Sequence, residues 1–453
     1  MNIQPFLKVF QSRKMAALIL LGFSSGLPFY LTGKDPLQAW LSQEGVDLKV
    51  IAAFSVAAIP YSLKFLWSPL LDRFVPPLLG RRRGWLIVSQ IVLLLAIGWM
   101  AFQDTSQLQQ TAVNSADICR NETFFKGFCE FRHTLQALSV SPFFIAALVV
   151  AFFSASQDIV ADAYRTEVLQ EYERGAGASV FLLGYRLAIL VAGALTFYLA
   201  GRFQSWGIEQ PWRWVYVIMA LLMAIGLMSS LIAPEPTAQI RPPETLAESV
   251  VMPFQDFIGR NGAGRALAIL VFIVVYRLGD SLLRNVATPF LLDKGLKFSP
   301  DDLATPRALS IAAVIVGTLA GGAIMTRIGI NRSLWFFAVL QASGNLLYVA
   351  LAEVGKNFPL MILAINLENF CAGLESAAFV AFLMGLCNPG LSATQYALLS
   401  SLAAFSRDIL VAPAGQWAQS MGWTAFFLLT AILALPGLLL LPLFAPWKER
   451  RAD

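Results

Sequence analysis

The sequence is poor in charged residues and nearly lacks histidine. Only 13% of its 453 residues are Asp, Glu, Lys or Arg, whereas soluble globular proteins carry about 25%. Hydrophobic residues reach 57%, and the mean hydropathy is +0.65. A chain with so little charge is typical of a protein whose surface faces lipid rather than water.

The shortage of catalytic side chains argues against an enzyme. The one histidine, His133, lies between apolar runs, where most acid–base mechanisms would be hard to build. The sequence has no Walker loop, no GxGxxG turn, no HExxH motif and no Ser-His-Asp arrangement. We therefore predict no enzymatic activity, no metal and no organic cofactor. The net charge of +5 reflects the loop pattern described below, so we do not predict nucleic-acid binding.

Cysteine is scarce, and the four cysteines divide into two pairs. Cys371 and Cys387 lie in or near an apolar run, where we expect them to be small packing residues. Cys119 and Cys129 share the longest segment between apolar runs, which also holds His133. A disulfide between them is possible if that side of the membrane is oxidising. A metal site made of these three residues is the weaker alternative.

Twelve apolar segments, each bounded by polar or turn residues, run through the chain. They cover residues 15–33, 48–71, 85–103, 141–163, 177–201, 213–233, 265–291, 305–326, 333–352, 359–385, 394–418 and 423–444. A helix of about 20 residues crosses a hydrocarbon core of about 30 Å. Because the runs are continuous rather than alternating, helices are favoured over a transmembrane β-barrel. We predict an all-α integral membrane protein with twelve transmembrane helices.

The loops indicate the orientation of the chain. Lys and Arg are more frequent in the loops on the side of the N-terminus than in the others, which predicts that both termini are cytoplasmic. Met15–Gly33 follows a basic start, and we interpret it as a retained first helix rather than a cleaved signal.

A proline-rich break at Ala233–Gly264 separates six apolar segments from six. We predict an N-terminal half at 1–233, a cytoplasmic linker at 234–264 and a C-terminal half at 265–453. We predict that residues Met252–Ile258 of the linker form a short amphipathic helix on the membrane surface.

The two halves resemble each other in sequence. Arg186 begins the run RLAILVAG in the fifth segment, and Arg407 begins RDILVAPAG in the eleventh. Each run follows a segment with an acidic residue, Asp158 or Glu375. A six-plus-six repeat with a site near mid-membrane is the architecture of the major facilitator superfamily.

Charged residues inside the apolar segments are the main functional signal. An ionisable side chain at the centre of a bilayer helix costs about 2.5–3.5 kcal/mol on insertion scales. Several together predict a polar interior shielded from lipid, which is typical of a solute pathway. The candidate proton-binding or substrate-binding residues are Lys64, Gln157, Asp158, Tyr185, Arg186, Arg277, Asp280, Glu368, Asn369, Glu375 and Arg407.

The carboxylates are candidates for carrying protons, and the cations are candidates for binding an anionic solute. Arg277 and Asp280 are three residues apart, so a mutual ion pair is an alternative for them. Glu368 and Glu375 are seven apart and share one face of a helix. Their alternative is an ion pair with Arg407 or Arg186 on other helices.

Two charged residues near a predicted helix end are interpreted as structural rather than as functional candidates. Asp162 and Arg165 follow Asp158 on the same helical face, and we expect an ordinary ion pair between them.

The loop after the second segment carries a candidate gate. Asp72 and Arg73 are followed, after a Pro-Pro insertion, by Arg81, Arg82 and Arg83. An acidic residue at a helix end beside a short basic loop can lock a cytoplasmic gate through charge-assisted hydrogen bonds. The alternative is that these arginines only anchor the loop on the positive side of the membrane.

At these motifs the sequence resembles the AmpG family of muropeptide permeases. The matching stretches are residues 21–40, 60–67, 72–85, 154–193, 276–280 and 368–415, and QDIVADAY at 157–164 is the most specific. The resemblance implies a proton-coupled importer that works by alternating access. Such permeases carry N-acetylglucosaminyl-1,6-anhydro-N-acetylmuramyl peptides across the inner membrane of Gram-negative bacteria for peptidoglycan recycling, and their flux can influence β-lactamase induction. We accordingly expect a monomer in the bacterial inner membrane, with the proton as coupling ion.

Two features differ from the family pattern. Many members carry two further C-terminal helices, whereas this chain ends at Asp453 after the twelfth apolar segment. The segment Asp104–Ser139 is also unusually long. Acetyl-CoA transporters are distant relatives, so another bulky anionic solute is the alternative substrate. A non-transporting membrane sensor is the alternative from a different class, although the sequence shows no sizeable soluble domain.

Overall fold

The structure is a computed structural model. It describes residues 12–33, 35–47, 50–51, 54–77, 80–106, 108–109, 126–236, 245–292, 295–298, 300–411 and 414–445. Throughout these ranges the regular structure is helical, with no strand, so the all-α prediction is confirmed. The predicted disulfide lies outside this account, because Cys119 is not among the described residues and nothing is described of the Cys129 side chain.

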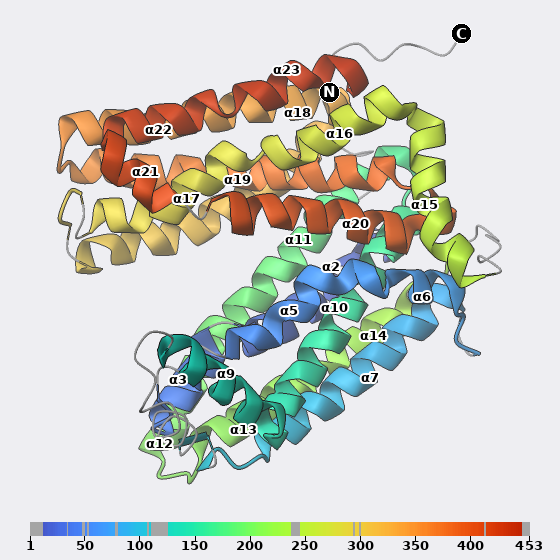
Figure 1. The fold of residues 1–453 in the computed structure, drawn as a ribbon, viewed down its shortest axis with the longest axis vertical. Helices are drawn as coiled ribbons and strands as arrows, with labels where there is room; N and C mark the ends of the chain where they lie inside the picture. The colour runs from blue at the N-terminus through green and yellow to red at the C-terminus, as the bar shows by residue number, and fades with distance from the viewer. Residues whose placement is uncertain are drawn as a thin grey trace. The chain divides into compact units, whose positions relative to one another are not determined.

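The chain divides into two compact units, shown in Figure 1. The first, here called the N unit, comprises residues 16–164 and 184–236; the second, the C unit, comprises 1–15, 165–183 and 237–453. The predicted halves differ from these units mainly in the segment 165–183, which groups with the C unit. The boundaries at 233 and 264 therefore remain a prediction.

The N unit is built from helices that pack closely through small residues. Its elements are α2 (Arg13–Gly33), α3 (Asp35–Gln43), η1 (Phe54–Ala58), α5 (Ile59–Leu63), η2 (Lys64–Leu66), α6 (Ser68–Arg73), α7 (Arg81–Ala101), α9 (Lys126–Ser139), most of α10 (Pro142–Val168), the end of α11 (Arg174–Leu190), η4 (Val191–Leu195), α12 (Thr196–Ser205), α13 (Pro211–Leu222) and α14 (Ala224–Ile232). A Cβ at Gly26 would lie 2.8 Å from the carbonyl oxygen of Tyr185, and a Cβ at Gly184 would overlap the carbonyl of Ile19. Only glycine lets α2 and α11 approach this closely.

The C unit contains the remaining elements. They are η3 (Glu171–Glu173), the first part of α11, α15 (Leu246–Asn261), α16 (Ala263–Val275), α17 (Leu278–Leu291), α18 (Pro300–Val354), α19 (Phe358–Leu386), η5 (Pro389–Leu391), α20 (Ser392–Phe405), η6 (Ser406–Leu410), α21 (Ala414–Met421), α22 (Trp423–Ile432) and α23 (Leu435–Phe444). The long α18 is two helices joined at Gly329, whose φ of 81° favours glycine. This joint lies between the predicted segments 305–326 and 333–352.

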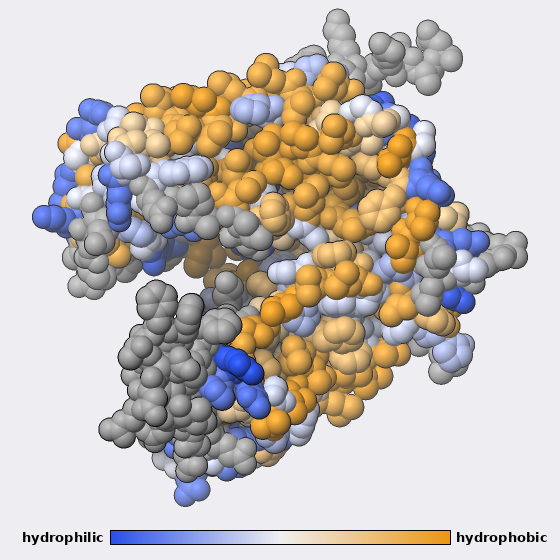
Figure 2. Space-filling model, viewed as in Figure 1, coloured by the Kyte–Doolittle hydropathy of each residue, from blue (hydrophilic) through white to orange (hydrophobic). Residues whose placement is uncertain are grey.

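Nine helical stretches among the described residues are long and apolar enough to cross a membrane. One of them, Thr305–Val354, contains two predicted segments. The predicted segments 48–71 and 394–418 are instead broken into short helices, so the total of twelve stays a prediction. Figure 2 shows hydrophobic side chains over the middle of the C unit and hydrophilic ones at both of its ends, as expected for a membrane-spanning bundle.

The linker contains the helix α15, which includes the predicted amphipathic stretch. Thr245 and Glu248 form a capping box at its start. Pro253 and Phe257 face the protein, whereas Phe254 on the other side is half exposed. The amphipathic helix is therefore present, and its position on a membrane surface remains a prediction.

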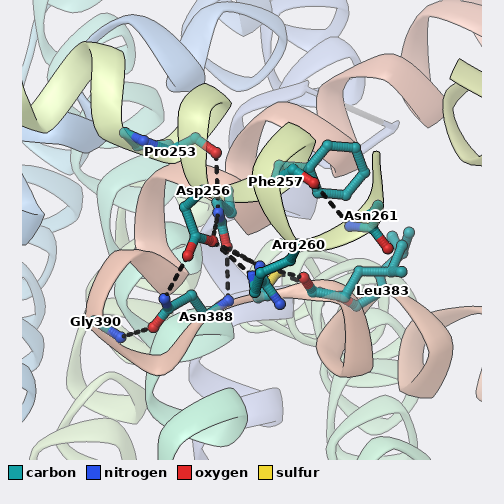
Figure 3. A network of polar contacts seen from close by, with 11 residues as sticks. Pro253, Asp256, Phe257, Arg260, Asn261, Leu383, Asn388 and Gly390 are labelled. Atoms are coloured by element: carbon teal, nitrogen blue, oxygen red, sulfur yellow. Dashed lines mark hydrogen bonds and ion pairs between the residues drawn. The ribbon is translucent and has the colours of Figure 1, made fainter. Parts of the chain in front are cut away.

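A polar network fastens α15 to the end of α19 and the start of α20 (Figure 3). The carboxylate of Asp256 accepts hydrogen bonds from Arg260 (2.9 Å), Asn388 (2.8 Å) and Gln395 (2.9 Å). Arg260 also donates to the carbonyl oxygen of Leu386 at 3.0 Å. Burial acts to raise the pKa of Asp256, but the hydrogen bonds from Gln395, Asn388 and Arg260 outweigh it and hold this pKa below its usual value of 3.8.

We expect Asp256→Asn to lower the free energy of unfolding at neutral pH by about 1–3 kcal/mol, because bonds to a charged acceptor contribute about that much. A lowered folded-state pKa stabilises above the unfolded pKa, and this contribution is lost as pH falls below it. Thermal unfolding in detergent between pH 7 and pH 3 measures both effects. The wild type should lose stability below about pH 4 more steeply than the variant. Glu353→Gln, at an exposed carboxylate, is the control. Parallel pH curves for Asp256→Asn and wild type would contradict the role of the network.

Candidate functional site

The C unit holds an arginine at a break in a membrane-spanning stretch. α16 ends at Val275 and α17 begins at Leu278, within the single apolar span Ala263–Leu291. Arg277 is the N-cap residue of α17, with non-helical backbone angles. Irregular backbone at membrane depth is tolerated only where it is buried in protein or lines a polar cavity. The break at Arg277 is therefore consistent with the polar interior that the sequence predicts.

Glu375 of α19 is the ionic partner of Arg277. Their closest atoms, Arg277 Nε and Glu375 Oε2, are 3.5 Å apart. Arg277 also donates to the Ser376 hydroxyl at 3.2 Å, and its guanidinium lies 5.8 Å from the ring centre of Phe379. The Glu375 side chain is 2% exposed and that of Arg277 is 33% exposed. The carboxylate is thus enclosed, while the arginine retains an open face.

Arg284, one turn further along α17 from Asp280, joins the other two carboxylates. Its guanidinium contacts Asp280 at 3.0 Å and Glu368 at 2.6 Å. Gln341 of α18 donates to the second oxygen of Asp280 at 2.8 Å, and Asn369 donates to Glu368 at 2.9 Å. Arg284 is 38% exposed, although both carboxylates are almost fully buried. Asp280, Glu368 and Asn369 are therefore brought into one network.

This pairing differs from the alternatives left open by the sequence. Arg277 contacts Glu375 rather than Asp280, because the helix break turns Arg277 away from the regular i, i+3 position. The recorded cation for Glu368 is Arg284, not Arg407. Arg284 was missed by the sequence reasoning, although its i, i+4 spacing from Asp280 was a usable signal. Gln341 offered no such signal.

Arg186 and Arg407 lie next to matching irregularities in their helices. Arg186 lies in α11, whose end continues into the π-helical turn η4. Arg407 is exposed and lies within the π-helical turn η6 that follows α20. Such turns are rare and are often found at functional sites. The sequence repeat around the two arginines thus has a counterpart in local structure within each unit.

In the N unit, the predicted polar residues are mostly enclosed. Gln157 is fully buried and donates to the hydroxyls of Ser24 (3.2 Å) and Ser25 (3.3 Å) on α2. Lys64 lies 3.7 Å from Asp162 of α10. Gln157 therefore holds α10 to α2, and Lys64 has a carboxylate neighbour.

Aromatic rings adjoin the other N-unit candidates. The ring of Phe29 lies 4.8 Å from that of Tyr61 and 6.4 Å from that of Tyr185. Asp158 is half-buried on α10 and interacts electrostatically with Tyr61. Tyr61 and Tyr185 thus both neighbour Phe29, and Asp158 acts on Tyr61.

Arg165 was expected to be a structural residue near a helix end. Its guanidinium lies over the rings of Phe181 (4.5 Å) and Tyr396 (4.9 Å) in the C unit. Cation–π contacts of this kind contribute to holding a buried arginine in place. Asp162 lies beside Lys64. The expected ion pair between Asp162 and Arg165 stays a prediction.

The candidate gate contains a fully buried ion pair. Arg82 Nη2 lies 2.8 Å from Asp72 Oδ1, and the two side chains are 0% and 1% exposed. Arg81 opens α7, and Arg73 lies 5.4 Å from the ring of Phe74. A pair so deeply enclosed is more than a surface anchor, because an unpaired charge there would be strongly unfavourable.

Glu235, which the sequence reasoning missed, caps the helix that carries Arg82. Its carboxylate accepts hydrogen bonds from the backbone N–H groups of Arg82 (3.2 Å) and Arg83 (3.3 Å) at the start of α7. A carboxylate at a helix N-terminus is favourable. A Cβ at Gly80, where φ is +83°, would collide with Glu235. Gly80 therefore permits both the turn and the cap.

No group of three or more His, Cys, Asp or Glu side chains in the described ranges could hold a metal ion.

Comparison with known proteins identifies the family. The family model described as Major Facilitator Superfamily matches residues 15–406. The anhydromuropeptide permease of Escherichia coli is 42% identical over 438 residues, covering 96% of this chain and 80% of that protein. A Rickettsia felis protein named putative transporter AmpG 4 is 29% identical over 96% of this chain and 97% of its own length. The solved proton:xylose symporter XylE, bound to 6-bromo-6-deoxy-D-glucose, has a TM-score of 0.66 at 11% identity, over 97% of this chain and 96% of that one.

The fold and the family match together define a multi-pass membrane transporter of the major facilitator superfamily. Within that superfamily, the chain belongs to the AmpG family. The relatives are permeases and transporters rather than enzymes.

Separate removal of Asp72 or Arg82 should destabilise the N unit. Asp72→Asn and Arg82→Gln should each lower the free energy of unfolding by about 3–5 kcal/mol, because each removes one member of a buried ion pair and leaves the charge of the other in place. The double variant should lose less than the sum of the two, which thermal unfolding of the purified protein measures. Arg202→Gln, at an exposed arginine of the same unit, is the control. Strictly additive losses would contradict a direct pair.

Proposed function

We propose that this chain is a proton-coupled importer of anhydro-muropeptides. The observation that carries the proposal is the 42% identity, across nearly the whole chain, to a protein named anhydromuropeptide permease. The proposed direction is from periplasm to cytoplasm across the bacterial inner membrane. We further propose that both termini are cytoplasmic and that the working unit is a monomer.

The arginines of the C unit are the proposed receptors for the anionic groups of the substrate. Arg277 and Arg284 each expose about a third of the side chain, while the carboxylates behind them are buried. Fixed cations in a low-dielectric cavity attract an anion strongly. Planar guanidinium groups also match a carboxylate with two parallel hydrogen bonds. A stem-peptide carboxylate is therefore a suitable ligand for either arginine.

Glu375 is the proposed proton carrier. While it is ionised, it neutralises Arg277. When it takes up a proton, its charge is removed, and Arg277 becomes available to an anionic group of the substrate. After the substrate leaves, loss of the proton restores the ion pair. One carboxylate thus links the presence of a proton to the presence of an anion at the same arginine.

The role that we propose for the N unit is different from that of the C unit. The ring of Phe29 adjoins those of Tyr61 and Tyr185, and the three rings offer apolar faces suited to a sugar ring. The pair Asp72–Arg82 is the proposed cytoplasmic gate. In this view the two predicted halves alternate in access, and the gate pair holds only one of the states.

Proteoliposomes test both the substrate and the coupling. Labelled GlcNAc-1,6-anhydroMurNAc peptide should accumulate under an imposed inward proton gradient, and collapsing the gradient should stop accumulation. Glu375→Gln should abolish gradient-driven accumulation and leave counterflow exchange largely intact, because the neutral side chain cannot exchange a proton. Glu353→Gln is the matched control.

The possible failures are distinguishable. Accumulation that does not depend on the proton gradient would contradict proton coupling but would still support the proposed substrate. Absence of both accumulation and counterflow in the wild type would contradict the proposed substrate. Wild-type behaviour of Glu375→Gln in both assays would make Glu375 structural.

Arg284→Gln should weaken substrate binding by about tenfold or more, since a charge-assisted hydrogen bond contributes about 1.5–3 kcal/mol. Counterflow at graded substrate concentrations measures this as a raised KM. Arg284→Lys keeps a cation for the buried carboxylates and separates loss of binding from loss of folding. An unchanged KM in a folded Arg284→Gln protein would exclude contact between Arg284 and the substrate.

A further inference from the structure

The C unit contains a cavity of about 610 Å³ that the proposed transport site does not use. We call it the basic cavity. Three arginines and one glutamate line it. Its charged and amide side chains are Glu171, Arg174, Arg260, Asn261, Arg265 and Asn331. An excess of positive charge with two amide side chains suits an oxyanion rather than a neutral or cationic ligand.

The basic cavity lies where several helices of the C unit begin or end. α11 begins at Arg174 and α16 at Ala263, while α19 ends at Leu386 and α23 at Phe444. The joint of α18 at Gly329 also lines the cavity. In Figure 1, α15 crosses this end of the unit. The ends of membrane-spanning helices mark the boundary between lipid and water, so the cavity lies at headgroup depth.

Arg174 lies in the basic cavity without a polar partner among the described residues. Its side chain makes no hydrogen bond or ion pair with any residue in the described ranges, and its Nε atom is buried. Nη1 lies beside the end of α19, 3.6 Å from where a Cβ on Gly385 would be. A partly buried guanidinium without an acceptor is unfavourable, and a bound anion would relieve this.

The other two arginines of the basic cavity use only some of their N–H donors within the protein. Arg265 donates to the carbonyl oxygen of Phe444 at 3.3 Å and has no recorded carboxylate partner. Arg260 donates to the carbonyl oxygen of Leu386 and pairs with Asp256 at 2.7 Å. A guanidinium carries five N–H donors, so both have donors left for a ligand.

Exposed apolar side chains lie on two of the helices that line the basic cavity. Leu267 follows Arg265 on α16, and Leu443 precedes Phe444 on α23; these side chains are 63% and 59% exposed. Tyr172, which lines the cavity, is also exposed, as is typical of aromatic residues at the level of lipid headgroups. A ligand with a phosphate at one end and hydrocarbon at the other fits both surfaces.

We propose that the basic cavity binds the phosphate group of an anionic phospholipid, with the acyl chains lying along α16 and α23. A soluble phosphate shares the oxyanion chemistry but gains nothing from the apolar surface. Basic cavities between membrane helices are suited to such headgroups. The inference does not depend on the transported substrate, because it concerns binding alone.

Native mass spectrometry of the full-length protein in neutral detergent tests the proposal. Phosphatidylglycerol should bind and raise the melting temperature, phosphatidylcholine should bind less, and inorganic phosphate at the same concentration should have little effect. Arg174→Gln combined with Arg265→Gln should weaken phosphatidylglycerol binding about 30-fold, since each arginine near anionic lipid contributes about 1 kcal/mol. Added salt should weaken it further.

The control is Arg307→Gln, at an exposed arginine at the other end of the C unit, which should bind lipid like the wild type. Arg174→Lys keeps the charge and should retain most of the affinity. Equal binding of phosphatidylcholine, unchanged affinity in the double variant, or an effect of inorganic phosphate alone would each overturn the lipid assignment. If the double variant is unstable, the lipid preference of the wild type decides.

Discussion

The whole arrangement depends on the need to neutralise charge in a low-dielectric interior. Asp280, Glu368 and Glu375 are almost fully buried, and each has a guanidinium within 3.5 Å. Buried ion pairs add little stability compared with well-packed apolar residues of similar volume. Five charged side chains in one helical bundle are therefore poorly explained as stabilising elements. The difference in exposure explains their presence better, since the carboxylates are enclosed and the arginines are partly exposed.

Backbone irregularity places these charges. The break between α16 and α17 puts Arg277 in the middle of a span, and the π-helical turns η4 and η6 accompany Arg186 and Arg407. A regular helix would have satisfied every backbone group internally, which membranes otherwise require. Departures at these three arginines therefore indicate a polar interior around them. Helix geometry and charge placement are two consequences of one constraint.

Sequence reasoning located the charges but not their partners. The sequence alone shows that Glu375 and Asp280 lie inside apolar segments, where a charge is energetically unfavourable. Both residues could therefore be predicted as functional candidates. Which arginine meets which carboxylate depends on how α17, α18 and α19 pack, and no spacing rule reaches across helices. Arg277 and Asp280 suggested a local pair, but the helix break sent them to different partners. Apolar runs likewise predicted the helices, yet not the interruptions within 48–71 and 394–418.

Burial also separates residues that the sequence had grouped together. Gln157 was one of a set of equal candidates, but it is fully buried and bonded to the hydroxyls of Ser24 and Ser25. A ligand reaches such a residue only if α2 and α10 part. Arg277 and Arg284 need no such movement, because about a third of each side chain is already exposed. Protonation of one enclosed carboxylate is a smaller change than separating two helices, so within the proposed mechanism the C unit is the simpler place to couple a proton to an anionic substrate.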